Sequence, residues 1–142
     1  MTPAALDCLR EHLDAENAHD LARIMATYVA APRVTINGRT FAGVEAVRAF
    51  HDRFGFGGSG AFSAIRVEER RRHVVDRAVV IEQTLSGVHT GKWQGLVPTQ
   101  KCFSLPVCTV YSFADDAKLA AEDVYFDASA ISAQLGAAPH GR

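Results

Sequence analysis

The sequence predicts an α+β domain, in which helices near the start of the chain pack against a long, mostly antiparallel sheet. Helical periodicity dominates residues 3–54, and strand-like segments fill residues 62–126. Strands and helices do not alternate as they would in a parallel sheet. The chain has 142 residues with no linker or internal repeat, so we expect one domain over 1–142, with a core at about 4–136 and a flexible tail at 137–142.

Two helices are expected first. Thr2-Pro3 places a capping hydroxyl before a proline at the first helical position. Asp20 is a good N-cap for a second helix, which we expect Pro32 to end. The apolar stripe of this second helix repeats at i, i+3, i+4 and i+7 and consists of Leu21, Ile24, Met25 and Tyr28.

A hairpin and a third helix follow. Asn37-Gly38 is a favourable turn between short strands at 33–37 and 39–41. Residues 44–54 form the third helix, with His51 on its apolar face. The glycine-rich segment 55–60 lacks the GxxxxGK[ST] pattern and leaves a helix rather than entering one, so we interpret it as a connector and not as a phosphate loop.

Four strands are expected near 62–74, 78–89, 101–113 and 119–126. The loop between the second and third of them carries Trp93, the only tryptophan, and a last helix over about 129–135 ends at Gly136. Odd and even positions of the strands are both moderately apolar. One face therefore covers the helices and a pocket, and the other packs on a second subunit, which predicts a homodimer. Periodicity alone leaves open which face is which.

Composition excludes several classes of partner. The formal net charge is −1, so no nucleic-acid partner is expected. No stretch reaches about 18 apolar residues, and no basic segment leads into an apolar run, so no membrane association is expected. Three cysteines, an odd count, argue against a disulfide framework and favour a reducing, cytoplasmic location.

Metals and cofactors are not expected either. The six histidines include no HxH or HxxxH pair, and the cysteines lie far from most of them in sequence. No motif for a nucleotide or another cofactor is present.

Three stretches resemble the marks of one family. Residues 16–21 (ENAHDL) are similar to its N-terminal helix signature, residues 86–99 to its G-x-H-x-G … P-T-G stretch, and residues 116–136 to its D-G-K-I … F-D … Q-L-G pattern. These are marks of SnoaL-like polyketide cyclases, in the superfamily of nuclear transport factor 2 and ketosteroid isomerase. The resemblance implies a cone-shaped, curved sheet with three N-terminal helices, which encloses a pocket for a small, largely apolar molecule.

The resemblance also marks a departure in the chemistry. Cyclases of this family close a ring by aldol condensation, in which an Asp removes a proton next to a carbonyl and a His assists. Counted back from Asp127, the position of the base falls on Val124, and that of the assisting histidine falls near Val110. A valine side chain has no group that can accept or donate a proton, so it can replace neither the Asp nor the His. The sequence thus keeps the scaffold of the cyclases and loses their catalytic pair.

Two glutamates are the alternative acids. In the family's orientation Glu122 shares the pocket face with Val124, and Glu82 lies on the even face of the strand at 78–89. Two acids beside an apolar pocket repel each other and lose hydration, which raises at least one pKa toward the value that proton abstraction needs. The alternative is that each lies near a strand end and is solvated.

Two further polar residues are candidates for catalysis. His89 ends a strand beside the Trp93 loop, where it either donates to a ligand or bonds the loop backbone. Asp127 precedes the last helix, and an N-cap is its simpler role. The residues that we expect to bind the ligand are Tyr28, His51, Trp93, Cys108, Val110, Val124 and Phe126.

Three functions fit these observations. The first is cofactor-free acid–base chemistry, as lyase, isomerase or cyclase, on a polycyclic or carbonyl compound. The second is non-catalytic binding of such a molecule, which the two valines favour. The third is a dimeric interaction module, which needs an exposed apolar patch beyond the dimer interface.

Overall fold

A computed structural model of the chain describes residues 1–136 and shows four helices and six strands in that range. In chain order they are α1 (Pro3–Asn17), α2 (Leu21–Ala26), β1 (Tyr28–Ile36), β2 (Arg39–Ala42), α3 (Val44–Phe54), β3 (Phe62–Val74), β4 (Ala78–His89), β5 (Cys102–Phe113), β6 (Leu119–Tyr125) and α4 (Ala128–Gln134).

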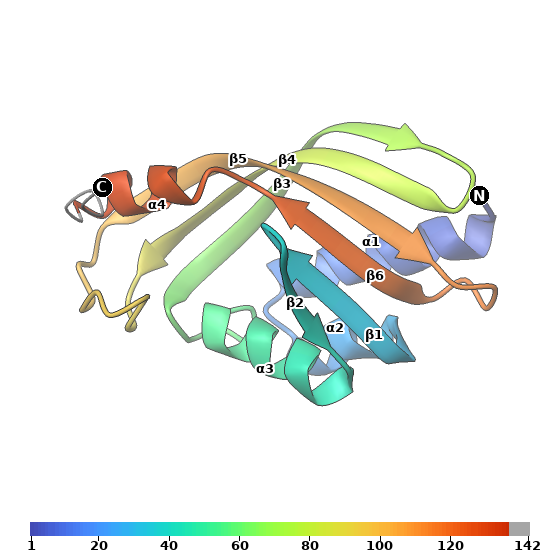
Figure 1. Cartoon of the computed structure of the whole chain (residues 1–142), viewed down its shortest axis with the longest axis horizontal. Coiled ribbons are helices and arrows are strands. Elements are labelled where there is room, and N and C mark those ends of the chain that lie inside the picture. Colours follow the sequence, from blue (N-terminus) through green and yellow to red (C-terminus); the bar gives the residue numbers. More distant parts are fainter. Residues whose placement is uncertain (137–142) are drawn as a thin grey trace.

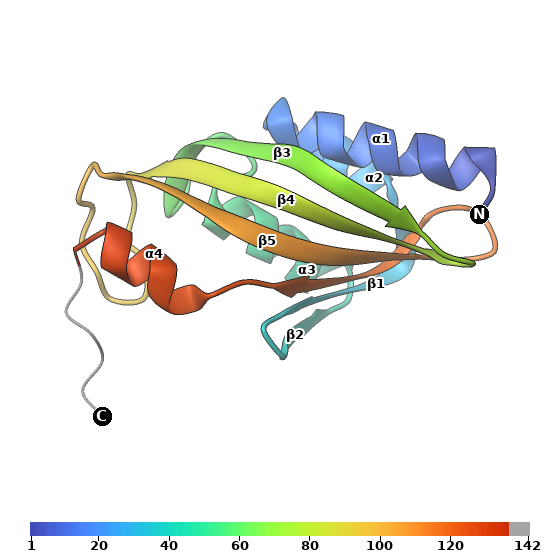
Figure 2. The same cartoon turned by 90° about the horizontal axis from the view of Figure 1, so that it is seen from above.

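The six strands form one open, curved sheet in the order β2-β1-β6-β5-β4-β3 (Figure 1). All neighbours are antiparallel except β1 and β6, which run parallel. Figure 2 shows α1, α2 and α3 together on one side of the sheet, and α4 beside the end of β5. The α+β class and the three N-terminal helices on a curved, mostly antiparallel sheet are therefore confirmed.

Side-chain caps begin three of the helices. The Thr2 hydroxyl accepts from the backbone N–H of Ala5 at α1, and Asp20 accepts from that of Arg23 at α2. Asp127 accepts from the N–H of Ser129 at α4. Each of these caps satisfies one N–H that a helix end leaves without a partner.

The second helix is shorter than the sequence predicts. It ends at Ala26, and Tyr28 begins β1 instead of closing the helical stripe. Pro32 lies inside β1, where the pairing with β6 is interrupted between Tyr28 and Arg33. Because proline has no N–H to give to a ladder, an interruption of this kind is where a strand tolerates it.

Strand register decides which side chains face the helices. Gln83 lies opposite Val107, and Thr109 lies opposite Val124. Directly opposed residues point to the same face of a sheet. Odd positions of β4 and β5 and even positions of β6 therefore share the concave face, toward α1 and α3. The odd positions of β4 and β5 are buried from Val79 to Phe113, while the even ones are half-buried or exposed.

Two smaller expectations concern the cysteines and the tail. Cys8, Cys102 and Cys108 are free thiols, as the odd count indicated. The tail predicted over 137–142 lies outside the described residues. Within 1–136 no helix has both the length and the apolar character needed to cross a membrane.

Candidate functional site

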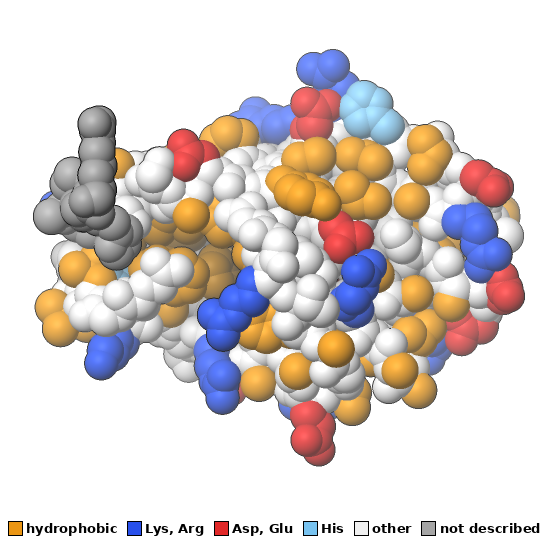
Figure 3. All heavy atoms as spheres, viewed as in Figure 1, with side chains coloured by type: hydrophobic (Ala, Val, Ile, Leu, Met, Phe, Trp, Pro, Cys, Tyr) orange, Lys and Arg blue, Asp and Glu red, His pale blue; other side chains and the backbone are white. Residues whose placement is uncertain are grey.

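A cavity of about 70 Å³ lies between the concave face of the sheet and α3. One buried water needs roughly 10–15 Å³, so this space holds more than a single water. Figure 3 shows a hollow with hydrophobic side chains between the loop that follows β4 and the central part of the molecule. The lining residues are Glu16, Ile36, Phe50, His51, Phe54, Phe56, Val67, Gln83, Leu85, Trp93, Val107, Thr109, Tyr111, Glu122, Val124 and Phe126.

Most of the wall is aromatic or aliphatic. Phe54 is central to it, because its ring stacks on Phe56 with 5.4 Å between centroids and meets the edge of Trp93 at 5.8 Å. Trp93 comes from the loop after β4 and also packs on Phe62, at 5.1 Å. Offset and edge-on aromatic contacts of this kind hold rings in fixed orientations. The wall is thus an ordered apolar surface.

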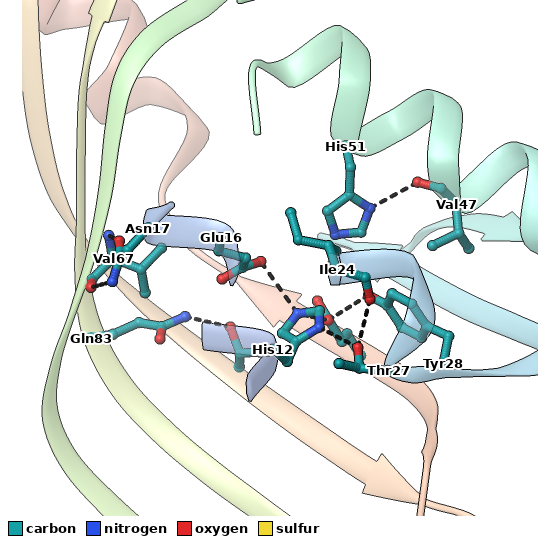
Figure 4. A network of polar contacts seen from close by, with 12 residues as sticks. His12, Glu16, Asn17, Ile24, Thr27, Tyr28, Val47, His51, Val67 and Gln83 are labelled. Carbon is teal, nitrogen blue, oxygen red and sulfur yellow. Dashed lines mark hydrogen bonds and ion pairs between the residues drawn. The ribbon is translucent and has the colours of Figure 1, made fainter. Parts of the chain in front are cut away.

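The inner end of the cavity is polar (Figure 4). His12 and Glu16 stand one turn apart on α1, and Glu122 comes from β6. His12 Nε2 lies 2.7 Å from Glu122 Oε1 and 3.4 Å from Glu16 Oε1. Neither contact has the direction of a hydrogen bond, so both are ion pairs in geometry. All three residues are buried, with His12 fully so.

The protonation of His12 follows from its neighbours. The hydroxyl of Thr27 donates to the carbonyl of Ile24, so it accepts from the Nδ1–H of His12, 2.8 Å away. Nε2 then faces two carboxylates. Burial alone lowers the pKa of His12, but the charges of Glu122 and Glu16 outweigh it and raise that pKa to about 10. The ring is therefore an imidazolium at neutral pH.

Glu122 is held in its ionised form. Burial alone raises its pKa, and the charge of His12 reverses this and lowers the pKa below the usual value. Its Oε1 also accepts a hydrogen bond of 2.5 Å from the hydroxyl of Tyr28. Burial and the negative charge of Glu122 raise the pKa of Tyr28 well above 10, so this hydroxyl keeps its proton.

His51 is the opposite case, a neutral imidazole on the cavity wall. A carbonyl only accepts, so the contact of 2.8 Å between Nδ1 and the carbonyl of Val47 fixes the proton on Nδ1. Burial lowers the pKa of His51, and the nearby carboxylates offset this only in part. The remaining nitrogen, Nε2, therefore carries a lone pair.

The same residues include a set with metal-ligand chemistry. His12, Glu16, His51 and Glu122 each offer a ligand atom, and these atoms all lie within 4.8 Å of one another. Two ligands that are about 2.0–2.1 Å from one tetrahedral zinc ion lie roughly 3.3 Å apart. The 2.7 Å between His12 and Glu122 is closer than this. The spacing fits an imidazolium between carboxylates better than two ligands of one ion.

Several residues that the sequence singled out come together here. His51, Trp93, Glu122, Val124 and Phe126 line the cavity. Tyr28 lies behind them, where its hydroxyl bonds Glu122. They come from α3, β1, β6, the segment directly after β6 and the loop after β4, which the fold brings to the concave side of the sheet.

The expectation that Glu82, Cys108 and Val110 face the cavity is wrong. Glu82 lies opposite Cys108 in the register, on the convex face of the sheet. Its side chain is 46% exposed and contacts His73 and Arg71. Val110 points to the same convex face because it is adjacent to Thr109, which faces the cavity.

His89 and Asp127 are placed away from the cavity wall. The Nδ1 atom of His89 accepts from the backbone N–H of Thr99 at 3.1 Å, so this fully buried ring bonds the loop backbone. Asp127 caps α4 and accepts from the N–H and the hydroxyl of Ser129. These hydrogen bonds lower the pKa of Asp127.

Sequence reasoning missed three residues of the polar end, namely His12, Glu16 and Tyr111. A His-x-x-x-Glu spacing on the first helix places both side chains on one face, and this was the available indication. Nothing in the sequence connected that face with Glu122, which is 106 positions after Glu16.

Comparisons with known proteins agree on the family and on the fold. The model of the SnoaL-like domain matches residues 9–122. A candidate SnoaL-like polyketide cyclase from Jannaschia sp. CCS1 superposes with a TM-score of 0.83 at 19% identity, over 98% of each chain. TsrD from Streptomyces laurentii gives 0.81 at 22% identity, over 97% of this chain and 99% of its own.

A third structure carries a bound small molecule. It is a protein of ketosteroid isomerase-like fold from Catenulispora acidiphila, in complex with trimethylamine. It superposes with a TM-score of 0.77 at 16% identity, over 97% of this chain and 96% of its own. None of the curated proteins matches this sequence. Likeness at these identities shows a shared fold.

Proposed function

The chain belongs to the SnoaL-like domain family, and from this we propose that it binds a small, largely apolar molecule in the cavity and moves a proton to or from it. One observation carries the proposal. The apolar wall ends at an ionised carboxylate, Glu122, and a neutral imidazole, His51, both on the cavity surface. A base must lie within hydrogen-bond reach of the proton it takes, and this end of the cavity offers two such groups.

The substitution at the family's base position narrows the choice of base. Val124 lines the cavity but has no group that titrates. Glu122 precedes it by two residues on the same strand and therefore points to the same face. We propose Glu122 or His51 as the proton acceptor, with His12 and Tyr28 as residues that position Glu122. The pKa of Glu122 is lowered and not raised as the sequence suggested, so Glu122 is a weaker base than expected, and His51 is the alternative acceptor.

The protein from Catenulispora acidiphila supports the binding part of the proposal. It has the same fold and was obtained in complex with trimethylamine, a small molecule. A protein of this fold thus binds a ligand of a few heavy atoms.

Non-catalytic binding is the second candidate, and Val124 is the observation in its favour. The two candidates differ in one measurable property. Only the first leads to exchange of a carbon-bound proton of the ligand with solvent deuterium, and to loss of that exchange in His51→Gln or Glu122→Gln.

Ligand entry is expected to change the fluorescence of Trp93. This ring lines the cavity and is the only tryptophan, so an apolar ligand alters its surroundings directly. Val124→Phe adds a ring inside the cavity and is expected to weaken binding about 10-fold or more, since one misplaced group in a packed site costs roughly 1–3 kcal/mol. Titration of the protein with small aromatic compounds measures both effects.

The matched control is Val75→Phe, the same substitution at a position that is 54% exposed, away from the cavity-lining residues. It should leave binding unchanged. Saturable binding that is equally tight in Val124→Phe, or that leaves the Trp93 fluorescence constant, places the ligand elsewhere. Circular dichroism verifies that both variants are folded.

We also propose that the protein is a homodimer that buries the convex face of the sheet. This face carries half-buried Val80 and Val110, and Tyr125, which is 54% exposed. Exposed apolar side chains on a sheet face favour a second copy as cover. Sedimentation velocity should give a dimer at micromolar concentration and a monomer for Val110→Arg. A monomeric wild-type protein contradicts the proposal.

A further inference from the structure

The polar end of the cavity offers hydrogen-bond acceptors that no described residue uses. Tyr28 and His12 contact Oε1 of Glu122, and no hydrogen bond within residues 1–136 reaches its Oε2. The same is true of Oε2 of Glu16, whose Oε1 lies near His12. These two carboxylates line the cavity, so their unused oxygens are available to a ligand.

Two more acceptors lie on the same wall. Gln83 is 6% exposed, and its Nε2 donates to the hydroxyl of Thr109, while its Oε1 is buried and has no hydrogen-bond partner among residues 1–136. His51 presents a lone pair, because its only ring proton is bonded to Val47. A buried acceptor without a donor costs free energy, and a ligand that brings a donor removes this cost.

The nearby donors are largely committed. Nδ1–H of His12 is bonded to Thr27, its Nε2 faces the two carboxylates, and Tyr28 donates to Glu122. Tyr111 and Thr109 contribute hydroxyls to the wall, which can accept as well as donate. A ligand atom that only accepts, such as a carbonyl oxygen, therefore meets mostly other acceptors.

The charge of the site also favours a ligand that donates hydrogen bonds, and in particular a cation. Two carboxylates surround one imidazolium at a buried site, so acidic groups outnumber basic ones there among the residues that the structure describes. Figure 3 shows basic side chains near the hollow, at the surface. Solvent and salt screen surface charges strongly, whereas charges in the interior interact through a lower dielectric. The buried negative charge therefore dominates inside the cavity.

The aromatic wall suits a cation as well. Phe50, Phe54 and Trp93 line the cavity together with Tyr111. Ring faces attract ammonium groups, and this attraction grows when the cation leaves water.

We propose that the ligand of this cavity is a protonated amine with apolar substituents. Its ammonium group lies between Glu16 and Glu122 and donates to an unused oxygen of one of them, and its substituents pack on the aromatic wall. This inference rests on the proposed function and narrows it. A binding site for small apolar molecules in general would not prefer an amine to a ketone of the same shape.

Three ligands of one shape test the inference. N,N-dimethylbenzylamine is protonated at pH 7.5, phenylacetone is its neutral carbonyl analogue, and phenylacetate is its anionic analogue. Binding to the full chain is measured by NMR titration of backbone amides around the cavity. We expect the amine to bind at least about 10-fold more tightly than the ketone, and the carboxylate at least about 10-fold more weakly than the ketone, since each tenfold step needs only about 1.4 kcal/mol.

Two isosteric variants test whether the preference for the amine comes from the carboxylate of Glu122. Glu122→Gln should weaken the amine about 10-fold or more and change the ketone by less than about 3-fold, because it removes charge and keeps shape. Glu82→Gln, the same change on the convex face, should alter neither ligand. Should Glu122→Gln fail to fold, Glu16→Gln makes the same comparison.

The outcomes separate the two proposals. A ketone that binds as tightly as the amine, or an amine unaffected by both cavity variants, overturns the amine class and leaves the small-molecule pocket intact. No binding of any of the three ligands at millimolar concentration to folded protein overturns both.

Discussion

Replacing His12 with leucine is expected to lower the free energy of unfolding by about 3–5 kcal/mol, the cost of removing one partner from a buried ion pair. The side chain of His12 is fully buried, and the variant leaves Glu16 and Glu122 at the polar end without the imidazolium between them. Two desolvated carboxylates then repel each other. Total stabilities of domains are about 5–15 kcal/mol, so the loss is large. Urea unfolding followed by circular dichroism measures it.

The chain provides a matched control on the opposite face of the sheet. His73 Nε2 lies 2.9 Å from Glu82 Oε2, nearly the spacing of the His12–Glu122 pair, but both side chains are about half exposed. His73→Leu should therefore cost less than about 1 kcal/mol, as exposed ion pairs do. The two substitutions are chemically the same, so the difference between them reports burial.

Coupling between the two partners is the sharper test. Glu122→Gln in the His12→Leu background removes one of the two unpaired carboxylates, and stability should partly recover. If the double variant is less stable than either single variant, the charges are not what makes His12 important. A loss in His12→Leu no greater than that in His73→Leu leads to the same conclusion.

The order of elements could be read from the sequence because local rules determine it. Thr2, Asp20 and Asp127 cap the helices that they were expected to cap. The strands from residue 62 onward lie within about two residues of the expected bounds, because long alternating segments and turn residues define them. Tyr28 is the exception, since its helical spacing from Ile24 and Met25 was accidental and tertiary pairing placed it in β1.

Which acid faces the cavity depends on strand register, which no local rule gives. Odd residues of β4 pair with odd residues of β5, as in Gln83 with Val107. Between β5 and β6, odd residues pair with even ones, as in Thr109 with Val124. A shift of one residue reverses every side chain of a strand. Glu82 and Glu122, both at even positions, therefore end on opposite faces.

The polar end was hidden for a related reason. Its charge pair joins α1 to β6, and an isolated His-x-x-x-Glu spacing on a helix is common at solvated surfaces. Burial turns it into an ion pair with a shifted pKa. The sequence could show the residue types on α1, but not that this face of the helix covers the inner end of a cavity.

The stability of the wild-type protein is expected to fall as pH rises above neutrality. The pKa of His12 is about 10 in the folded state and about 6.5 in the unfolded chain. The folded state therefore holds this proton more tightly. The stabilisation is fully present below pH 6.5 and is lost as pH rises through 10.

The slope of the free energy of unfolding against pH, between the two pKa values of His12, measures the one extra proton that the folded state binds. Between about pH 7 and pH 9 the folded state binds one more proton than the unfolded chain at His12, which corresponds to a loss of about 1.4 kcal/mol per pH unit. Tyr28 and Tyr111 have pKa values raised above 10 by burial and negative charge, so their contribution begins only near pH 10. The thiol of Cys8, with a pKa raised above 9.0 by burial, begins to contribute near that value.

Urea midpoints at half-unit steps from pH 6 to pH 9 test this dependence. The wild-type protein should lose stability steadily above pH 7, whereas His12→Leu should be nearly flat from about pH 7.5 to pH 9, because it has no proton to lose at that site. Below this range the lowered pKa of His51 should reduce the stability of both proteins as pH falls, since the unfolded chain takes up that proton. Glu122→Gln should move the onset only slightly but bring the end of the decline to lower pH, since the imidazolium keeps Glu16 alone as its counter-charge. A flat wild-type profile across the window means that His12 is neutral in the folded protein. The inner end of the cavity then carries the full charge of both carboxylates, and the positioning role given to His12 is lost.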